Sequence, residues 1–280
     1  MPSLITKLRQ NNRHKLVDSL VTNARNKRVL FANGAFYYID DTGRYHILQG
    51  LLPVLKRNYW PHTNFTSIMK QPRDVRVGGK KNKKRKKDDD FVVKKPSKGW
   101  FFGSIQGKQV HNELDDFILL DDKNFKKKHT QLHPWTKRLL VDIICRMKWL
   151  PIKCEFAVCD ESIRVGTAID MICVDPSNGN LIFIEFKTGY ASYFENNDGQ
   201  MKRCLSFMKN SPLNWANVQL VSSVMMLLKY YPHIPLSHTS SYVIRIDDSD
   251  IHYYHIDNSF IKKMHGKLLV NLKEKEKIRI

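Results

Sequence analysis

The chain has 280 residues, of which 42% are hydrophobic and 11% aromatic, and its formal net charge is +20. This length and composition predict a globular protein with one main domain. No apolar run approaches the roughly 20 residues that a membrane-spanning helix needs, which argues against an integral membrane protein. The five cysteines are isolated, without a CxxC pair, and this pattern favours buried thiols in a reducing, intracellular compartment over disulfides or a zinc site.

The positive charge is concentrated in the N-terminal third. Residues 1–98 contain 23 Lys and Arg against 7 Asp and Glu, a net of +16, whereas residues 99–280 contain 24 against 20, a net of +4. Such a segment favours a polyanionic partner, and nucleic acid is the leading candidate, because phosphate contacts release counterions. A solvated basic tail that only keeps the protein soluble is the alternative.

Residues 1–69 are predicted to form a basic, partly ordered N-terminal extension. Asp18 is the only acid before Asp40, and an amphipathic helix is allowed by the spacing of Leu4, Leu8, Leu16 and Leu20. A basic, amphipathic, acid-poor start is typical of an organelle transit peptide, although its arginine content is modest and serine is sparse. After it, short strands and turns are predicted around the Asn33-Gly34 and Thr42-Gly43 pairs.

Residues 70–98 are predicted to be a basic, disordered linker. Seven of the eight residues from Lys80 to Lys87 are basic, and such a run repels itself and cannot bury apolar surface. The same composition fits a nuclear import signal or a nucleic-acid-binding arm.

Residues 99–280 have the pattern of one α/β domain. Helices are predicted in the stretches "GKQVHNELDDFILLDD" (107–122), "PWTKRLLVDIICRMKWLP" (134–151) and "NWANVQLVSSVMMLLKYYP" (214–232), with a terminal helix from about Ser259. Strands are predicted in "IKCEFAVC" (152–159), "RVGTAIDMICV" (164–174) and "LIFIEFK" (181–187), the last two as a hairpin turning at Asn178-Gly179. A second hairpin is predicted for 240–246 and 251–256.

The first hairpin carries charges among apolar residues. Side chains alternate along a strand, so Glu185 and Lys187 are predicted to share a face, and Asp170 is predicted to share a face with Ile172 and Val174 and to approach Glu185. Two carboxylates in an apolar setting are costly unless a cation lies between them, and Mg²⁺ or Mn²⁺ suits oxygen ligands. Lys187 could then orient the attacking water and stabilise charge on a phosphate. The alternative is an exposed hairpin with an ordinary Glu–Lys pair, which contributes little.

An Asp on one strand followed by acid-x-Lys on the next resembles the PD-(D/E)XK nuclease superfamily. The stretch "GKQVHNELDDF" resembles the G-x-x-x-H helix of its RecB-type exonuclease branch, "CEFAV" the strand with an accessory Glu, and "NVQLVSSVMML" the Gln-Leu helix. The motif order and the final hairpin and helix are most similar to the mitochondrial genome maintenance exonuclease family, over about residues 99–265. The resemblance implies a restriction-endonuclease-like core, in which helices flank a mixed central sheet.

The resemblance also implies roles for individual residues. Metal ligands would be His111, Asp170, Glu185 and the backbone carbonyl of Phe186. Lys187 would be the catalytic lysine, Glu155 a supporting acid, and Gln219 a group that positions the lysine or the DNA backbone. From the residues alone, His111 could be structural, Glu155 solvent-facing and Gln219 an interface residue.

Two departures from the family pattern concern Gly166 and the cysteines. The family often shows G-x-x-D before the hairpin, whereas here one more residue separates Gly166 from Asp170, which leaves the role of Gly166 open. Some RecB-type nucleases hold an iron–sulfur cluster through one upstream and three downstream cysteines. Only Cys204 follows Lys187 in this chain, so no such cluster is expected.

The function implied by the resemblance is a metal-dependent deoxyribonuclease that hydrolyses phosphodiesters and leaves a 5′-phosphate. Exonuclease action on single-stranded DNA ends, in replication, repair or genome maintenance, is favoured, with stacking on Trp100, Phe101 and Phe102 unless these are core residues. An endonuclease or flap nuclease of the same fold and a catalytically inactive nucleic-acid-binding protein are the alternatives. The mitochondrion is the expected location, and the basic tract makes the nucleus the alternative.

Overall fold

The computed structural model describes residues 28–61, 98–118, 131–189, 194, 199–264 and 268, and in the helix 98–118 it describes side chains from residue 106 onward. The predicted transit peptide up to residue 27 and the predicted linker up to residue 97 lie outside the described residues. The side chains of Trp100, Phe101 and Phe102 lie outside them too. Within the described ranges, no helix has both the length and the apolar character needed to cross a membrane.

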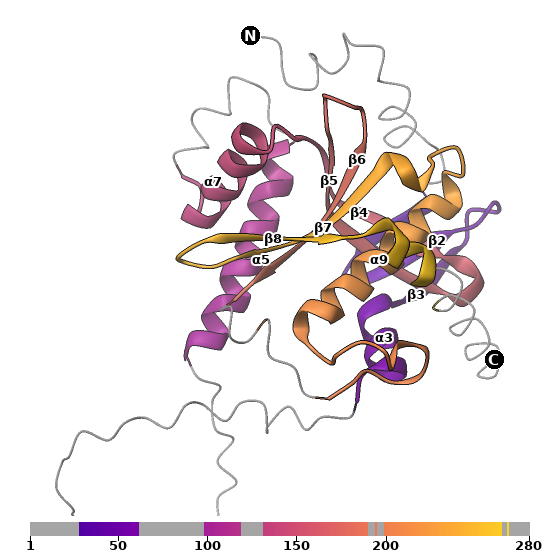
Figure 1. Cartoon of the computed structure of the whole chain (residues 1–280). Helices are drawn as coiled ribbons and strands as arrows, with labels where there is room; N and C mark the ends of the chain where they lie inside the picture. The colour runs from indigo at the N-terminus through magenta and orange to yellow at the C-terminus, as the bar shows by residue number, and fades with distance from the viewer. Residues whose placement is uncertain are drawn as a thin grey trace, which may run out of the picture.

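The described strands form one mixed sheet of eight strands in the order β1-β2-β3-β5-β6-β7-β8, with β4 paired to β5 (Figure 1). Most neighbours are antiparallel, but the β3–β5 and β6–β7 pairs are parallel. The strands are β1 (Val29–Ala32), β2 (Ala35–Ile39), β3 (Tyr45–Gly50), β4 (Leu150–Asp160), β5 (Val165–Val174), β6 (Leu181–Thr188), β7 (Thr239–Ile246) and β8 (Ile251–Ile256).

Helices cover both faces of this sheet, as Figure 1 shows. They are α3 (Leu51–Tyr59), α5 (Lys98–Ile118), α7 (Pro134–Val141), which continues into one π-helical turn (Asp142–Arg146), and α9 (Pro212–Tyr230). Helices α3 and α9 bury one face with Leu181 and Phe183 of β6, and α5 and α7 bury the other with Ile182, Ile184 and Phe186. The sequence prediction of an α/β domain with a mixed sheet flanked by helices is confirmed.

Local sequence signals account for the main elements. Helix α9 begins after Ser211, whose hydroxyl accepts a hydrogen bond from the backbone N–H of Asn214, with Pro212 in the first turn. The β5–β6 hairpin turns at Gly179, which has φ +76° and donates its N–H to the carbonyl of Asp175 at 2.8 Å. Gly tolerates this conformation because it has no Cβ. Both predicted hairpins are present.

Strand β5 lies at a fork in the sheet. One edge of β5 pairs with β4 along its length, while the other pairs with β3 only at Val165–Gly166 and with β6 only at Met171–Val174. The β5–β6 ladder ends at the Met171–Ile184 pair, and β6 continues alongside β7 as far as Thr188. The strands therefore separate just where Asp170 and Glu185 would have faced each other.

The N-terminal strands belong to the same sheet as the predicted nuclease domain. Gly50 of β3 pairs with Gly166 of β5, so the boundary drawn near residue 99 does not separate two folded units, and residues 29–59 form part of the core. A Cβ on Gly166 would lie 2.8 Å from the Cβ of Phe36 and 3.0 Å from Leu48. Gly166 therefore permits close packing of the N-terminal strands against β5, a role that the sequence analysis left open.

Candidate metal centre

Asp170 lies at the fork and joins the two separating strands. It is 8% exposed, and its Oδ2 accepts a hydrogen bond of 2.7 Å from the backbone N–H of Phe186. The Asp170 carboxylate thus accepts the hydrogen bond that a backbone carbonyl of β5 would accept if the pairing of β5 with β6 continued. Its other oxygen, Oδ1, lies 3.8 Å from Nδ1 of His111.

The side chains of β5 do not alternate regularly through Asp170. Ile169 and Ile172 both belong to the core on the α9 side, and Met171 belongs to the core on the α5 side. Regular alternation would put Ile169 and Ile172 on opposite faces. The prediction that Asp170 shares one face with Ile172 by simple alternation is therefore wrong. The irregularity lets Asp170 meet α5.

The neighbouring strand β4 is irregular at the matching position, Glu155. Its φ of +45° is unusual for a residue with a Cβ, and Cys154 and Phe156 on either side of it point into opposite cores. Backbone conformations of this kind cost of order 1–3 kcal/mol and cluster at functional sites. Here the exposed Glu155 places its Oε1 at 2.8 Å from Nδ1 of His111.

Helix α5 brings His111 to these acids because a glycine one turn earlier lets it approach the sheet. A Cβ on Gly107 would lie 3.0 Å from Oγ1 of Thr188, at the end of β6. Val110 and Leu114 are buried on the same helix and hold it against the sheet. The Gly-x-x-x-His spacing therefore has a physical reason, since residues four apart lie on one face of a helix.

The described residues contain one group of His, Cys, Asp or Glu side chains that could hold a metal ion. It consists of His111, Glu155 and Asp170, whose potential ligand atoms all lie within 4.8 Å of one another. This set differs in one member from the predicted side-chain ligands, because Glu155 takes the place of Glu185. The acid predicted to have only a supporting role thus lies at the centre of the cluster.

Glu185 is buried beside this group and is paired with Lys187. Its side chain is 1% exposed, and its Oε1 accepts a hydrogen bond from the ammonium of Lys187. Its Oε2 is buried and has no hydrogen-bond partner among the described residues. Burial, followed by repulsion from Asp170, raises the pKa of Glu185 to about 7. An orphaned buried carboxylate oxygen is costly, and a cation would relieve that cost.

Two cations balance the acids of the site. Burial lowers the pKa of His111, but Asp170 and Glu155 outweigh it and raise the pKa to about 9. Burial likewise lowers the pKa of Lys187, but Glu185 and Asp170 raise it more. The protonated imidazole therefore lies where a metal ion would interact with the same acids, and an ion that used Nδ1 would replace its proton.

The donor set fits a hard divalent cation. It offers carboxylate oxygens from Asp170 and Glu155 together with one imidazole nitrogen, and the buried carboxylate of Glu185 interacts electrostatically with Asp170 and His111. Such ligands suit Mg²⁺ or Mn²⁺ better than soft, thiolate-binding metals. Burial raises the pKa of the nearby Cys154 thiol well above its ordinary value, which disfavours the thiolate form needed for metal binding.

The predicted roles of two site residues, Gln219 and Phe186, have no contact in the structure that bears on them. Gln219 lies on α9, and no hydrogen bond or ion pair of its side chain is found among the described residues; only its backbone carbonyl accepts one, from Ser223. The carbonyl of Phe186 is predicted to bind the metal, whereas the contact seen at this residue is made by its N–H, which donates to Asp170. The roles of Gln219 and of the Phe186 carbonyl stay predictions.

Sequence reasoning missed Arg245, which is 1% exposed and lies beside Lys187 in the β6–β7 register. A signal for it existed, because an arginine interrupts the apolar run of "SSYVIRI" (240–246). An arginine is rarely fully buried without a partner.

No model of a known protein family matches the chain, and no curated protein sequence matches it. The resemblance to the PD-(D/E)XK nucleases therefore depends on the motifs themselves.

Proposed function

We propose that the chain is a metal-dependent deoxyribonuclease of the PD-(D/E)XK type. One observation carries the proposal: the four acidic or imidazole residues singled out by the motifs come from α5, β4, β5 and β6 and gather with Lys187 at one fork. His111 and Glu155 lie outside the β5–β6 hairpin and have no local reason to meet Asp170, Glu185 and Lys187 unless the fold brings them together. A chance match of short motifs would scatter them over the molecule.

His111, Asp170 and Glu155 would hold the ion, with Glu185 within reach of the same site. A bound Mg²⁺ or Mn²⁺ would neutralise charge that develops on a scissile phosphate. Asp170 also holds the N–H of Phe186, so it fixes the strand that carries Glu185 and Lys187. Asp170 thereby links the proposed metal ligands to the strand that carries Lys187.

Lys187 would stabilise the phosphate and orient the attacking water. About a third of its side chain is exposed, whereas its partner Glu185 is 1% exposed. The buried carboxylate thus fixes the ammonium by an ion pair, and the exposed part of the lysine remains open to a substrate. A preorganised cation of this kind favours charge developing in the transition state.

DNA as the substrate is supported by the net charge of +20 and by the family resemblance. The resemblance favours exonuclease action on single-stranded ends in genome maintenance, and a mitochondrial location. A tagged copy that lacks residues 1–27, and so keeps β1 intact, tests the location, because loss of mitochondrial import is then expected. Import that persists would contradict a transit peptide.

The decisive experiment measures cleavage of labelled single- and double-stranded DNA in the presence of Mg²⁺ or Mn²⁺. We expect Lys187→Ala and Asp170→Asn each to lower cleavage by about 100-fold or more, while the control Lys262→Ala, an exposed lysine, leaves it unchanged. Cleavage that survives in both site variants would overturn the proposal.

Two further outcomes separate the alternatives. Cleavage of closed single-stranded circles as fast as of linear strands would indicate an endonuclease. Tight DNA binding without cleavage, and without thermal stabilisation by Mn²⁺, would indicate a nucleic-acid-binding protein.

A further inference from the structure

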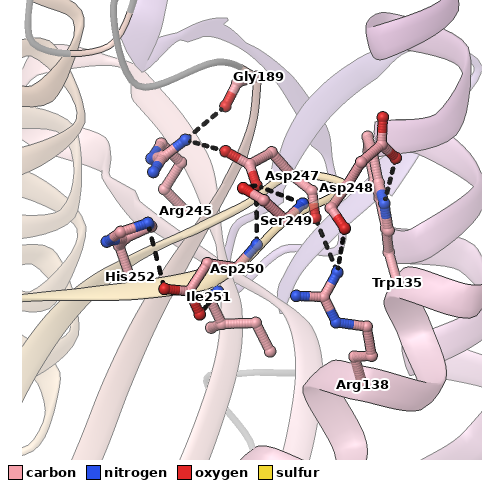
Figure 2. A network of polar contacts seen from close by, with 10 residues as sticks. All are labelled: Trp135, Arg138, Gly189, Arg245, Asp247, Asp248, Ser249, Asp250, Ile251 and His252. Atoms are coloured by element: carbon pink, nitrogen blue, oxygen red, sulfur yellow. Dashed lines mark hydrogen bonds and ion pairs between the residues drawn. The ribbon is translucent and has the colours of Figure 1, made fainter.

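A buried arginine lies directly beside the proposed catalytic lysine. Arg245 of β7 pairs with Lys187 of β6 in the parallel ladder and is only 1% exposed. Its Nη1 donates to the carbonyl of Gly189 at 3.0 Å and to the carboxylate of Asp247 (Figure 2). Its Nε has no hydrogen-bond partner among the described residues. This side chain therefore ties the end of β6 to the β7–β8 turn.

Asp247 is itself held rigidly in that turn. Its Oδ1 accepts hydrogen bonds from the N–H of Ser249 at 2.9 Å, the hydroxyl of Ser249 at 2.6 Å and the N–H of Asp250 at 2.9 Å (Figure 2). Burial raises the pKa of Asp247, but the bonds from Ser249, Asp250 and Arg245 outweigh it and hold the pKa well below its usual range. The carboxylate stays charged and fixed.

Helix α7 connects this turn to the helix that carries His111. Arg138 donates to the carbonyls of Asp247 and Asp248 at 2.9 and 3.1 Å, and Nε1 of Trp135 donates to Oδ1 of Asp248 at 3.1 Å (Figure 2). At its start, α7 is anchored to Glu113 of α5, which accepts from the N–H of His133 at 2.8 Å and the hydroxyl of Thr136 at 2.6 Å.

We infer that Arg245 and Asp247 are positioning residues for Lys187, a role that depends on the proposed nuclease function. Beyond the fork, β6 no longer pairs with β5, so among the described strands its last residues form a backbone ladder with β7 alone. Strand β6 ends at Thr188, and the next residue, Gly189, has φ +134°. Arg245 donates a hydrogen bond to the carbonyl of Gly189 and so fixes the end of the strand that carries Lys187.

Stability alone does not account for a buried Arg–Asp pair at this place. Desolvating two charges offsets most of their attraction, and apolar residues of similar size often stabilise a core as well. An arginine, by contrast, holds two acceptors at once in a fixed planar geometry. Lys187 needs a fixed position if its ammonium is to contact a phosphate, because small displacements of reacting groups lower the reaction rate.

The test uses a second acid–cation pair in the same chain as its control, in which the acid, Asp160, is buried and the cation, Lys229, is exposed. Asp160 is 0% exposed and accepts from Lys229 at 2.8 Å and from both the N–H and the hydroxyl of Ser162. It thus repeats the acid, serine and cation arrangement of Asp247 at the end of β4. Among the described residues, Asp160 makes no hydrogen bond or ion pair with His111, Glu155 or Asp170. Full-length Arg245→Lys and Arg245→Met/Asp247→Asn are compared with Asp160→Asn/Lys229→Met.

We expect both Arg245 variants to lower kcat for DNA cleavage by roughly 10- to 100-fold, with KM and Mn²⁺ affinity within about twofold of wild type. The Asp160/Lys229 variant should lower the melting temperature but leave kcat within about twofold. An unchanged kcat in folded Arg245 variants, or an equal loss of kcat in the control, would overturn the inference.

Amide hydrogen exchange separates this inference from the proposed function. In Arg245→Lys we expect faster exchange at residues 187–189, with the β4–β5 pairing still protected. If the wild type cleaves no DNA, the nuclease proposal fails while this measurement still decides whether Arg245 fixes the strand end. Unchanged exchange at these residues rejects the role of Arg245.

Discussion

Gly107 and Thr188 lie in direct contact, so that a Cβ added to Gly107 would come within 3.0 Å of Oγ1 of Thr188. Gly107 lies one helical turn before His111, and Thr188 follows Lys187 directly. This contact therefore sets the distance between the helix that carries the imidazole and the strand that carries the lysine. The two halves of the candidate site are brought together at this point.

We expect Gly107→Ala to weaken Mn²⁺ binding and cleavage without unfolding the protein. The added methyl group must push α5 away from β6 or displace the threonine, and His111 moves with the helix. Alanine is also the better helix former by about 1 kcal/mol, which offsets the local strain. Calorimetric Mn²⁺ titration and thermal unfolding measure the two effects.

The double variant Gly107→Ala/Thr188→Ala is its control. Replacing Thr188 by alanine removes Oγ1 and Cγ2 and leaves its Cβ 3.9 Å from the added methyl group. Mn²⁺ affinity should therefore recover toward that of Thr188→Ala alone, as a double-mutant cycle would reveal. Additive losses would show that the contact does not set the position of His111.

Glu185→Gln should have opposite effects on the metal-free and the metal-bound protein. It removes a buried charge whose Oε2 has no partner, so we expect the metal-free protein to gain roughly 1 kcal/mol at pH 8. The partly exposed Lys187 loses only a modest ion pair. Stabilisation by Mn²⁺ should fall in the same variant, as thermal unfolding with and without the ion would measure.

Glu113→Gln is the matched control, because Glu113 accepts hydrogen bonds with both of its oxygens. This variant should destabilise the protein and leave the Mn²⁺-dependent shift intact. A Glu185→Gln protein that is less stable without metal, yet is stabilised by Mn²⁺ as strongly as wild type, would argue against a cation beside Glu185.

Metal affinity should rise with pH up to about pH 9. Nδ1 of His111 must lose its proton to become a ligand, and the pKa of His111 is raised to about 9. Between pH 6.5 and 8.5 we therefore expect the Mn²⁺ dissociation constant to fall about tenfold per pH unit. Titration calorimetry in buffers of different ionisation enthalpy would count the released proton. A flat profile, or one identical in His111→Gln, would exclude the imidazole as a ligand.

The metal-free protein should lose stability as the pH rises from about 4.5 to 9. The folded-state pKa is raised from 4.5 to about 7 at Glu185 and from 6.5 to about 9 at His111. The folded state thus holds more protons than the unfolded state in this window, and its stability falls as they dissociate. Acids with lowered pKa, such as Asp247, act only at lower pH.

Thermal unfolding in the presence of a chelator measures this slope. The double variant His111→Gln/Glu185→Gln should show a flatter profile, since neither replacement titrates. Stability that rises with pH across the same window in the wild type would mean that these two groups are not held as the structure places them.

Much of the architecture could be predicted because it depends on near neighbours in the sequence. The hairpin at Asn178-Gly179 and the helix that begins at Pro212 follow from turn chemistry, capping and periodicity. Asp170, Glu185 and Lys187 could be identified as candidate site residues because charged side chains in an apolar run are costly to bury. The Gly107-to-His111 spacing also follows from the helical period.

Other features depend on chain segments that are far apart. Pairing of Gly50 with Gly166 joins the N-terminal strands to the domain across residues 51–165, and no local pattern encodes such a partner. The left-handed conformation of Glu155 and the irregularity at Asp170 arise together on two paired strands. Regular alternation of side chains therefore predicts the wrong face for Asp170.

The sequence by itself therefore determined most elements of residues 99–280, their order and the residue types able to bind a cation, because these depend on propensity, periodicity and the cost of buried charge. Only the tertiary structure decided that the pairing of β5 with β6 ends next to Asp170, that Glu155 contacts His111, and that Arg245 hydrogen-bonds to the carbonyl of Gly189 just after β6. Each of these contacts joins separate elements. Their geometry depends on how strands pair and helices pack, which short-range patterns do not specify.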